Sequence, residues 1–292
     1  MTNNKIAVLG NGFLGKEFSK KGYEVLDRSE FEWPIDTIRL GIFKQLEPYD
    51  TIINCIGCAD TRYCEDPENW SSVYNINAKL VSALSKYCKH RNKKFVHIST
   101  GCVYDKNNQP QKETDFTSSH CRYVVSKLTA EYYCSPNDLI LRPRLYFSDT
   151  PDKNNLLTKL PKFERHLTEI NSYTSTKTIV EATQALLEAG QSGIFNVAQE
   201  GYATIEQICQ YIGIIKKPTL NGEELRQEQG LYLVNNILDI SKLKKFYQPR
   251  NLEEELSRCW NSIKNHPSTK TTEFADCKNF SVSHQNLADR WG

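Results

Sequence analysis

The stretch "KIAVLGNGFLGKEF", residues 5–18, decides the fold. A compact apolar run ends at Gly10, and helical spacing begins after Gly12. With Gly15, these glycines form the pattern G-x-G-x-x-G between the two segments. Glycines at this point let the backbone approach a pyrophosphate at the N-terminus of the helix. The stretch therefore predicts a strand, a turn and a helix that bind a dinucleotide; a plain tight turn is the alternative.

Strands and helices alternate along the following part of the chain. Strands are expected in "YEVLD" (23–27), "DTIINCIG" (50–57), "KKFVHIST" (93–100) and "DLILRP" (138–143). Helices are expected between them, in "IRLGIFKQL" (38–46), "SSVYNINAKLVSALSKYCKHRN" (71–92) and "RYVVSKLTAEYYC" (122–134). This order predicts an α/β fold, a doubly wound parallel sheet of Rossmann type with right-handed crossovers.

The alternation loosens after about residue 145. Helices are still expected at 176–190, 204–213 and 251–265, with a short strand "GIFNVA" at 193–198. We therefore expect a dinucleotide-binding domain over residues 1–145 and a smaller C-terminal lobe over 146–265, with interleaving of the two allowed. The polar segment 266–292 has no periodic pattern, which predicts disorder or docking on the surface.

Composition limits the class of protein. The 292 residues are 39% hydrophobic and 25% charged, which is enough to bury a core. The net charge of +2 is too small for an electrostatic nucleic-acid surface. The first residues show no signal pattern, and no run approaches the roughly 20 apolar residues that span a bilayer. We expect a cytoplasmic protein with no nucleic-acid or membrane partner.

The ten cysteines are spread along the chain. Without a secretory signal this spread favours reduced thiols. Cys55 and Cys58 form a C-x-x-C, and Cys64 follows six residues later. A metal or redox site needs more partners, and no second C-x-x-C or matching His pair follows. We expect no metal, and Cys55 ends its strand as a small apolar residue; a redox or metal site is the alternative.

Two charged residues after the second strand bear on the cofactor. Asp27 suits hydrogen bonds from adenosine ribose hydroxyls, whereas Arg28 suits a 2′-phosphate, so the choice between NADH and NADPH stays open. The other predicted contacts lie in the glycine turn and after the third strand: Gly10, Gly12, Phe13, Leu14, Gly15, Cys55, Ile56 and Gly57.

The segment "YVVSK" carries a second signal. Tyr123 and Lys127 stand four residues apart on a predicted helix and share a face. A phenol has a pKa of about 10, and a neighbouring ammonium stabilises its phenolate. Thr100 ends a strand at the sheet edge where such folds bind ligands, and its hydroxyl can hydrogen-bond a carbonyl oxygen. Together the three predict a site for carbonyl chemistry; the alternative is an amphipathic helix with a solvated lysine.

These motifs resemble the extended short-chain dehydrogenase/reductases. More narrowly, the chain is similar to nucleotide-sugar 4-keto reductases such as the dTDP-4-dehydrorhamnose reductases, and most of all to the bifunctional 3,5-epimerase/4-reductases that make UDP-rhamnose. The resemblance covers roughly residues 5 to 264. It rests on "WSSVYNINAKL" (70–80), "STGCVYD" (99–105), "LRPRLYFSD" (141–149), "NNLLTK" (154–159), "SGIFNVAQEGYATIEQI" (192–208) and "NNILDISKLKKF" (235–246).

The resemblance implies roles for particular residues. Tyr123 protonates the C4 oxygen, Lys127 lowers its pKa and holds the nicotinamide ribose of NADPH or NADH, and Thr100 positions that oxygen. Cys102 and Lys159 move protons at C3 and C5, which a C4 ketone makes acidic.

The resemblance also implies a substrate and its binding residues. The substrate is a UDP- or dTDP-linked 4-keto-6-deoxyhexose, bound by the smaller lobe with help from Thr100, Asn77 and Arg144, and a homodimer is common among such enzymes.

The sequence departs from the family pattern at three points. The glycine loop is one residue shorter, "LDRSEFEWP" (26–34) lacks the arginine-bearing turn, and "LYLVNN" (231–236) lacks an arginine. The alternatives are a 4-reductase without epimerase activity, a non-catalytic nucleotide-binding regulatory subunit, and a 4,6-dehydratase or 4-epimerase. A dehydratase usually has an acidic pair beside the threonine, and "STGCV" has none.

Overall fold

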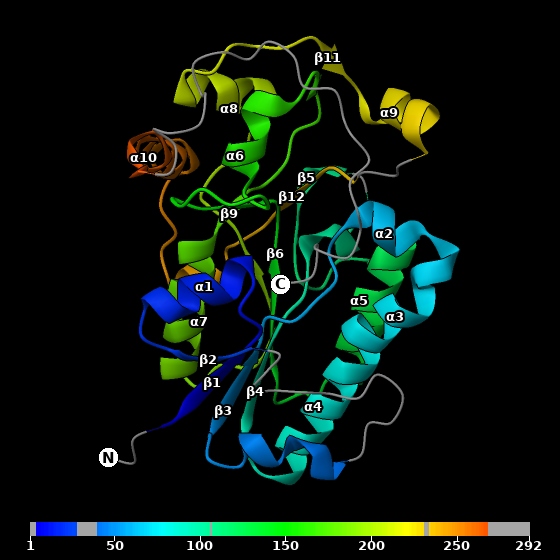
Figure 1. Cartoon of the computed structure of the whole chain (residues 1–292), viewed down its shortest axis with the longest axis vertical. Helices are drawn as coiled ribbons and strands as arrows, with labels where there is room; N and C mark the ends of the chain where they lie inside the picture. Colours follow the sequence, from blue (N-terminus) through cyan, green and yellow to red (C-terminus); the bar gives the residue numbers. More distant parts are fainter. Residues whose placement is uncertain (1–3, 28–39, 106, 231–233, 268–292) are drawn as a thin grey trace.

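The computed structural model describes residues 4–27, 40–105, 107–230 and 234–267. Its centre is a six-stranded sheet in the order β10-β6-β4-β3-β1-β2 (Figure 1). All the pairings in this sheet are parallel, which confirms the predicted doubly wound fold. The strands are β1 (Ile6–Leu9), β2 (Glu24–Leu26), β3 (Thr51–Asn54), β4 (Lys94–Ile98), β6 (Leu139–Pro143) and β10 (Gly193–Val197). The strands β2 and β3 lie on opposite sides of β1, and such sheets bind ligands where the strand order reverses.

Helices cover both faces of the sheet (Figure 1). The helices α1 (Phe13–Lys20) and α7 (Thr176–Glu188) lie on one face, and α4 (Leu80–His90) and α5 (Arg122–Tyr133) lie on the other. Within β1, Ala7 and Leu9 pack into the core with α4, while Val8 packs into the core with α1 and α7. Strands buried on both faces read as continuous apolar runs, as this one does.

Two predicted helices differ in detail from the structure. Residues 71–92 form α3 (Trp70–Tyr74), a π-helical turn η3 (Asn75–Lys79) and α4 in direct succession. The helix predicted at 38–46 is wrong in type: the described part is a 3-10 helix, η1 (Leu40–Leu46), kinked at Phe43. Gly41 disfavours an α-helix here because glycine loses more backbone freedom on ordering than other residues do.

A second core lies beyond β6. Leu157, Ile208 and Trp260 are among its buried residues. It contains α6 (Leu156–Lys159), η5 (Leu160–Lys162), α8 (Ile205–Ile212) and α10 (Leu252–Asn265). The remaining elements are α2 (Thr61–Glu65), η2 (Pro67–Asn69), η4 (Gly101–Val103), β5 (Asn107–Gln111), β7 (Tyr146–Phe147), β8 (His166–Leu167), β9 (Thr174–Ser175), β11 (Thr219–Leu220), α9 (Gly222–Gln229), β12 (Asn236–Leu238) and η6 (Leu243–Lys245).

The division of the chain at residue 145 stays a prediction. Both α7 and β10 follow that residue, yet they belong to the layers of the main sheet, so a smaller lobe would interleave with the first domain. In the predicted tail, residues 268–292 lie outside the described residues. Within the described part, no helix has the length and apolar character needed to cross a membrane.

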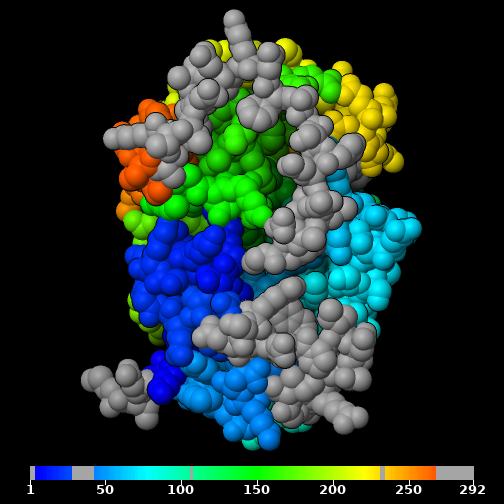
Figure 2. Space-filling view, in the orientation of Figure 1, coloured from blue at the N-terminus to red at the C-terminus, as the bar shows by residue number. Residues whose placement is uncertain are grey.

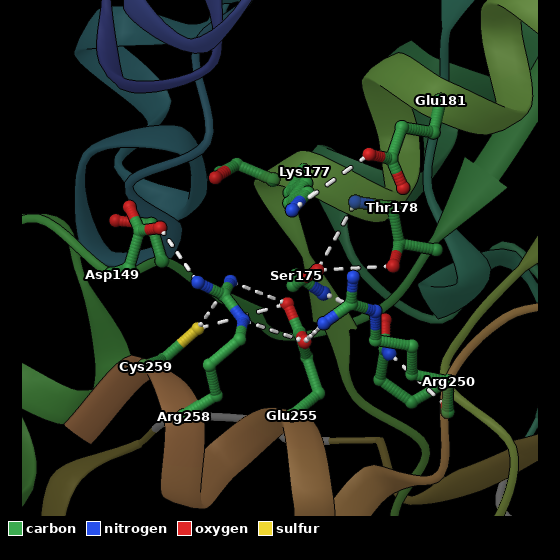
Figure 3. A network of polar contacts seen from close by, with 12 residues as sticks. Asp149, Ser175, Lys177, Thr178, Glu181, Arg250, Glu255, Arg258 and Cys259 are labelled. Carbon is green, nitrogen blue, oxygen red and sulfur yellow. Dashed lines mark hydrogen bonds and ion pairs between the residues drawn. The ribbon is translucent and has the colours of Figure 1, made fainter. Parts of the chain in front are cut away.

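Ion pairs tie the segment between β7 and α6 to two helices. Asp149 accepts a hydrogen bond from Arg258 Nη1 at 3.0 Å, and Arg258 also pairs with Glu255 (Figure 3). On the other side, Lys20 Nζ lies 3.4 Å from Asp149 Oδ1. Burial raises the pKa of the Asp149 carboxyl, but Arg258 and Lys20 together hold that pKa below its usual value.

A second ion pair joins the same surfaces. Lys16 of α1 lies 3.5 Å from Asp152. Figure 2 shows that the surface of the blue N-terminal residues borders the surface of the green residues that come later in the chain. The segment leading into α6 therefore rests on α1, the helix that follows the glycine turn.

Candidate active site

The turns after four neighbouring strands bring predicted site residues to one edge of the sheet. Gly10 follows β1, Cys55 follows β3, Thr100 lies just after β4, and Arg144 follows β6. Backbone hydrogen bonds continue the pairing past the strand ends, with Cys55 N donating to Leu9 O at 3.0 Å. Residues far apart in the sequence are therefore neighbours at the carboxyl edge, where doubly wound sheets bind ligands.

The glycine turn fits the diphosphate of a dinucleotide. Gly10 has a φ of +99°, and a Cβ placed on Gly15 would lie 1.9 Å from Gly10 O, so α1 packs directly on the turn. A Cβ on Gly12 would meet no atom within 4 Å. Gly12 caps α1 without a side-chain hydrogen bond, and no acidic residue lies in the first turn. The helix N-terminus can therefore offer its amides to an anion.

The other residues predicted to contact the cofactor are only partly accounted for. Leu14 is buried in the core beside the sheet, while Phe13, at the start of α1, is half-buried. Asp27 directly follows β2, and Arg28 lies outside the described residues. Their contacts with a cofactor stay predictions.

The segment after β3 lies against the amine of Lys127. A Cβ on Gly57 would lie 3.7 Å from Lys127 Nζ and 3.5 Å from Asn77 Oδ1. Burial raises the pKa of the Cys55 thiol, and the Lys127 charge opposes this shift. Ile56 donates its backbone N–H to Asn54 Oδ1 at 3.2 Å, which fixes the turn.

Lys127 is a buried ammonium at the centre of the site. Its side chain is 4% exposed, and Nζ donates to the carbonyl of Ile98 at 2.8 Å. Burial lowers the pKa of Lys127 to about 8, against an opposing contribution from Glu131. The positive charge is therefore held at neutral pH in a site that disfavours it.

This pKa predicts a pH-dependent stability. In the unfolded chain a lysine has a pKa of about 10.4, so the unfolded state binds more protons than the folded state between about pH 8 and pH 10. Stability therefore rises with pH in that window, and the cost of the buried charge is fully present below it. Relative to Lys127→Met, the wild type should gain on the order of 2 kcal/mol in unfolding free energy from about pH 7 to pH 10. Denaturant titrations of both proteins check this, and parallel pH curves would contradict it.

Tyr123 lies one helical turn before Lys127 and close enough to Thr100 for that residue to act on its pKa. Burial raises the pKa of Tyr123 well above its usual value, the Cys102 charge raises it further, and a hydrogen bond with the Thr100 hydroxyl lowers it. Thr100 Oγ1 also accepts the backbone N–H of Cys102 at 3.1 Å. The structure thus brings Thr100, Cys102 and Tyr123 together, with a phenol that is protonated at neutral pH.

Arg144 is directed toward Cys102. Its Nη1 lies 2.7 Å from Cys102 Sγ, and its Nη2 donates to Asn171 Oδ1 at 2.8 Å and to the Val234 carbonyl. The residue is only 5% exposed, and these three partners of its guanidinium are all uncharged in their usual forms. A buried positive charge therefore sits beside the half-buried thiol; a contact of Arg144 with sugar or phosphate stays a prediction.

Asn77 supports the site from the π-helical turn. Its Oδ1 accepts Cys58 N at 2.8 Å, and its Nδ2 donates to Cys58 O at 2.9 Å and to Ser126 Oγ at 3.0 Å. These contacts fix the segment after β3 against α5. Both amide hydrogens are used inside the protein, so a contact of Asn77 with substrate stays a prediction.

Lys159 ends α6 and is exposed. Although the residue as a whole is exposed, partial desolvation of its amine by the surrounding chain lowers the pKa of Lys159, while the charges of Asp60 and Asp152 raise it. No hydrogen bond joins Lys159 to Cys102 or Tyr123, all of which the structure describes. Its predicted role in proton transfer is untested.

Tyr146 was missed by the sequence reasoning. Burial and the charges of Cys55 and Cys102 raise its pKa, and its own charge acts on Tyr123. Tyr146 and Cys55 both pack against the core beside the sheet. Leu145 before it has a φ of +36°, an uncommon conformation for a branched residue, and this turn redirects the chain after β6. The only sequence signal was its place in "LRPRLYFSD".

The thiols after β3 pair differently from the C-x-x-C pattern. Cys58 contacts Cys64, with 3.3 Å between the sulfur atoms, while Cys55 packs into the core beside the sheet. Both members of the contacting pair are free thiols. Over the described ranges, no three His, Cys, Asp or Glu side chains gather closely enough to hold a metal ion.

Comparison with known proteins gives the family. Residues 5–221 match the family model described as RmlD substrate binding domain, which is more than half of the chain. The chain belongs to this family. A curated relative, the probable low-salt glycan biosynthesis reductase Agl14 of Haloferax volcanii, is 27% identical over 241 residues, covering 70% of this chain and 78% of the relative. The resemblance found in the sequence is confirmed at the level of the family.

Two solved structures share the fold. The L780 UDP-rhamnose synthase of Acanthamoeba polyphaga mimivirus aligns with a TM-score of 0.79 at 16% identity, covering 89% of this chain and 100% of that one. The dTDP-4-dehydrorhamnose reductase of Bacillus anthracis, solved in complex with NADP, aligns with a TM-score of 0.74 at 18% identity, covering 89% and 99%. These likenesses support the Rossmann-like architecture and, at such low identity, the fold alone.

Proposed function

We propose that this protein reduces the C4 ketone of a nucleotide-linked 4-keto-6-deoxyhexose with NADPH or NADH. Membership of the RmlD family and the reductase, synthase and NADP named for its relatives support this substrate class and cofactor. The observation that carries the proposal is the convergence of Thr100, Tyr123 and Lys127 at the carboxyl edge of the sheet.

The residues of the chain divide the work of reduction. When bound, the nicotinamide supplies the hydride that C4 receives. The Tyr123 phenol gives its proton to the C4 oxygen, which would otherwise become an alkoxide. The Lys127 charge lies one turn away and stabilises the phenolate left behind. Thr100, whose hydroxyl acts on the pKa of Tyr123, orients the same oxygen.

The glycine turn and the segment after β3 would hold the cofactor. The amides at the start of α1 suit its diphosphate, and Gly57 lies beside Lys127, which suits the nicotinamide ribose. We also propose that the segment after residue 145 binds the sugar nucleotide. The predicted homodimer and cytoplasmic location are untested.

A second activity, 3,5-epimerisation, is favoured by the position of Cys102. The thiol lies near Tyr123 and contacts the buried guanidinium of Arg144 at 2.7 Å. A plain reductase needs no such thiol beside its acid. Inversion at C3 or C5 requires one group to remove a proton and another to return one from the opposite face. We propose Cys102 as one of these groups and Lys159 as the other.

The deciding experiment supplies UDP- and dTDP-4-keto-6-deoxyglucose with NADPH or NADH in deuterated water. Cofactor oxidation with deuterium at C3 and C5 of the product is the expected result. Oxidation without label leaves a 4-reductase and removes the epimerase. Tight cofactor binding with no turnover of either sugar, or of the same sugars already epimerised at C3 and C5, would overturn the proposal in favour of a regulatory subunit.

Two glycines of the turn should respond differently to alanine. A Cβ on Gly12 meets no protein atom, so Gly12→Ala should fold normally but weaken NADPH binding by about tenfold or more, since the diphosphate approaches there. A Cβ on Gly15 overlaps Gly10 O, so Gly15→Ala should lower the unfolding free energy by about 1–3 kcal/mol. Thermal unfolding and fluorescence titration with NADPH measure both effects. Unchanged NADPH affinity in Gly12→Ala would argue against this diphosphate site.

A further inference from the structure

The carboxylate of Glu65 lies at the N-terminus of the helix that carries Tyr123. Glu65 ends α2, and its two oxygens accept the first backbone amides of α5. Oε2 accepts Arg122 N at 3.1 Å, and Oε1 accepts Tyr123 N at 3.0 Å. Arg122 Nη1 returns a hydrogen bond to the Glu65 carbonyl at 2.5 Å. A side chain from another helix therefore caps α5.

The Glu65 carboxylate compensates for a weak N-cap residue in α5. The first amides of a helix have no partner within the helix. Cys121 is the N-cap residue of α5 and forms no capping hydrogen bond through its side chain, in keeping with sulfur being a weak acceptor. A carboxylate at this end also interacts favourably with the positive end of the helix dipole and makes charge-assisted hydrogen bonds. Much of the order of the first turn therefore depends on Glu65.

The cap acts on the acid itself, since one of the two amides belongs to Tyr123. The other end of the same turn is held separately: Ser126 Oγ donates to the Tyr123 carbonyl at 2.7 Å and accepts a hydrogen bond from Asn77. Lys127, farther along the helix, is fixed by the Ile98 carbonyl. Loss of Glu65 should therefore disturb Tyr123 more than Lys127.

Glu65 is itself held in place by its neighbour. Cys64 is fully buried and contacts Cys58 across 3.3 Å between sulfur atoms. Cys58 is in turn fixed by Asn77 through both backbone groups. Together these contacts anchor α2 between the segment after β3 and the start of α5.

We propose that Glu65 is a positioning residue for the proton donor, because its carboxylate fixes the first turn of α5 and so holds the Tyr123 hydroxyl in reach of the substrate carbonyl. This inference rests on the proposed reductase function. It implies that the turnover number depends on Glu65. The KM for the cofactor should not depend on Glu65, because it is set by Lys127 and the glycine turn.

The test compares four variants with the wild type. Glu65→Ala should lower kcat about tenfold and leave the KM for NADPH within about twofold, a tenfold loss being about 1.4 kcal/mol. Glu65→Gln keeps the side-chain volume and one acceptor oxygen, so its kcat should lie between those of Glu65→Ala and the wild type. Glu65→Ala combined with Cys121→Ser should recover most of the loss, because serine is a strong N-cap. Glu68→Ala, which removes an exposed carboxylate of η2, is the matched control and should match the wild type.

Amide hydrogen exchange gives a readout that needs no turnover. The amides of Arg122 and Tyr123 should exchange about tenfold faster or more in Glu65→Ala and recover in the double variant. Wild-type kcat in Glu65→Ala would overturn the inference, and so would equal changes in kcat and the KM for NADPH that Cys121→Ser fails to reverse. A wild-type protein without turnover would instead overturn the proposed function, while the exchange rates would still decide whether Glu65 caps the helix.

Discussion

Replacing Tyr123 by phenylalanine should lower the rate of cofactor oxidation by about 10²–10⁴-fold, the usual contribution of a positioned general acid. Thr100 acts on the pKa of this hydroxyl, and burial keeps the phenol protonated at neutral pH. The ring that packs against Cys58, Cys64 and Val73 is retained in phenylalanine. We therefore expect normal folding and NADPH affinity within about twofold of the wild type, with the loss confined to turnover.

The same helix offers a matched control for this variant. Tyr132 lies on α5 as well and is 84% exposed, so Tyr132→Phe removes a hydroxyl of the same kind away from the site. Stopped-flow measurement of the first turnover separates hydride transfer from product release. Equal rates in Tyr123→Phe and Tyr132→Phe would show that another group protonates the C4 oxygen, and the proposed mechanism would fall.

The part of the site that the sequence predicts well depends on local patterns. The glycine turn lies between an apolar run and a helical repeat, so its conformation follows from neighbouring residues. The spacing of Tyr123 and Lys127 follows from the helical period. Thr100 could be placed beside them because the carboxyl ends of parallel strands share one edge, and the effect of Thr100 on the pKa of Tyr123 agrees with this.

The part that the sequence does not predict depends on packing between distant segments. The guanidinium of Arg144 approaches Cys102 because β4 and β6 are neighbours, and the left-handed turn at Leu145 then carries Tyr146 into the same region. Glu65 reaches α5 because α2 packs against that helix. Short strands such as β7 and β9 span two residues each, which is too short for any period to show.

The position of β10 illustrates the same limit at the level of topology. The sequence predicts a strand at "GIFNVA" but not the strand with which it pairs. In the structure it extends the main sheet beside β6, in a register that pairs Gly193 with Leu139 and Val197 with Pro143. Strand pairing across some fifty residues is set by tertiary packing, and propensity alone does not reveal it.

Replacing Cys102 by serine should separate the two proposed activities. A hydroxyl ionises far less readily than a thiol, so a residue that must take and return a proton loses its function while the volume hardly changes. We expect deuterium incorporation at C3 and C5 to fall by about 100-fold or more. Reduction of a sugar already epimerised at both carbons should stay within about threefold of the wild type, since Thr100, Tyr123 and Lys127 are unaltered.

Another thiol of the chain provides the control for this variant. Cys134 is half-buried like Cys102 but is the C-cap residue of α5, at the opposite end of the helix from Tyr123, so Cys134→Ser should keep both labelling and reduction. Nuclear magnetic resonance of the product in deuterated water measures label at each carbon separately. Loss of deuterium label at only one carbon would assign proton transfer at that carbon to Cys102. Proton transfer at the other carbon would then belong to a second group such as Lys159. Full labelling in Cys102→Ser would remove the thiol from the proton path, and its contact with Arg144 would then be a feature of packing alone.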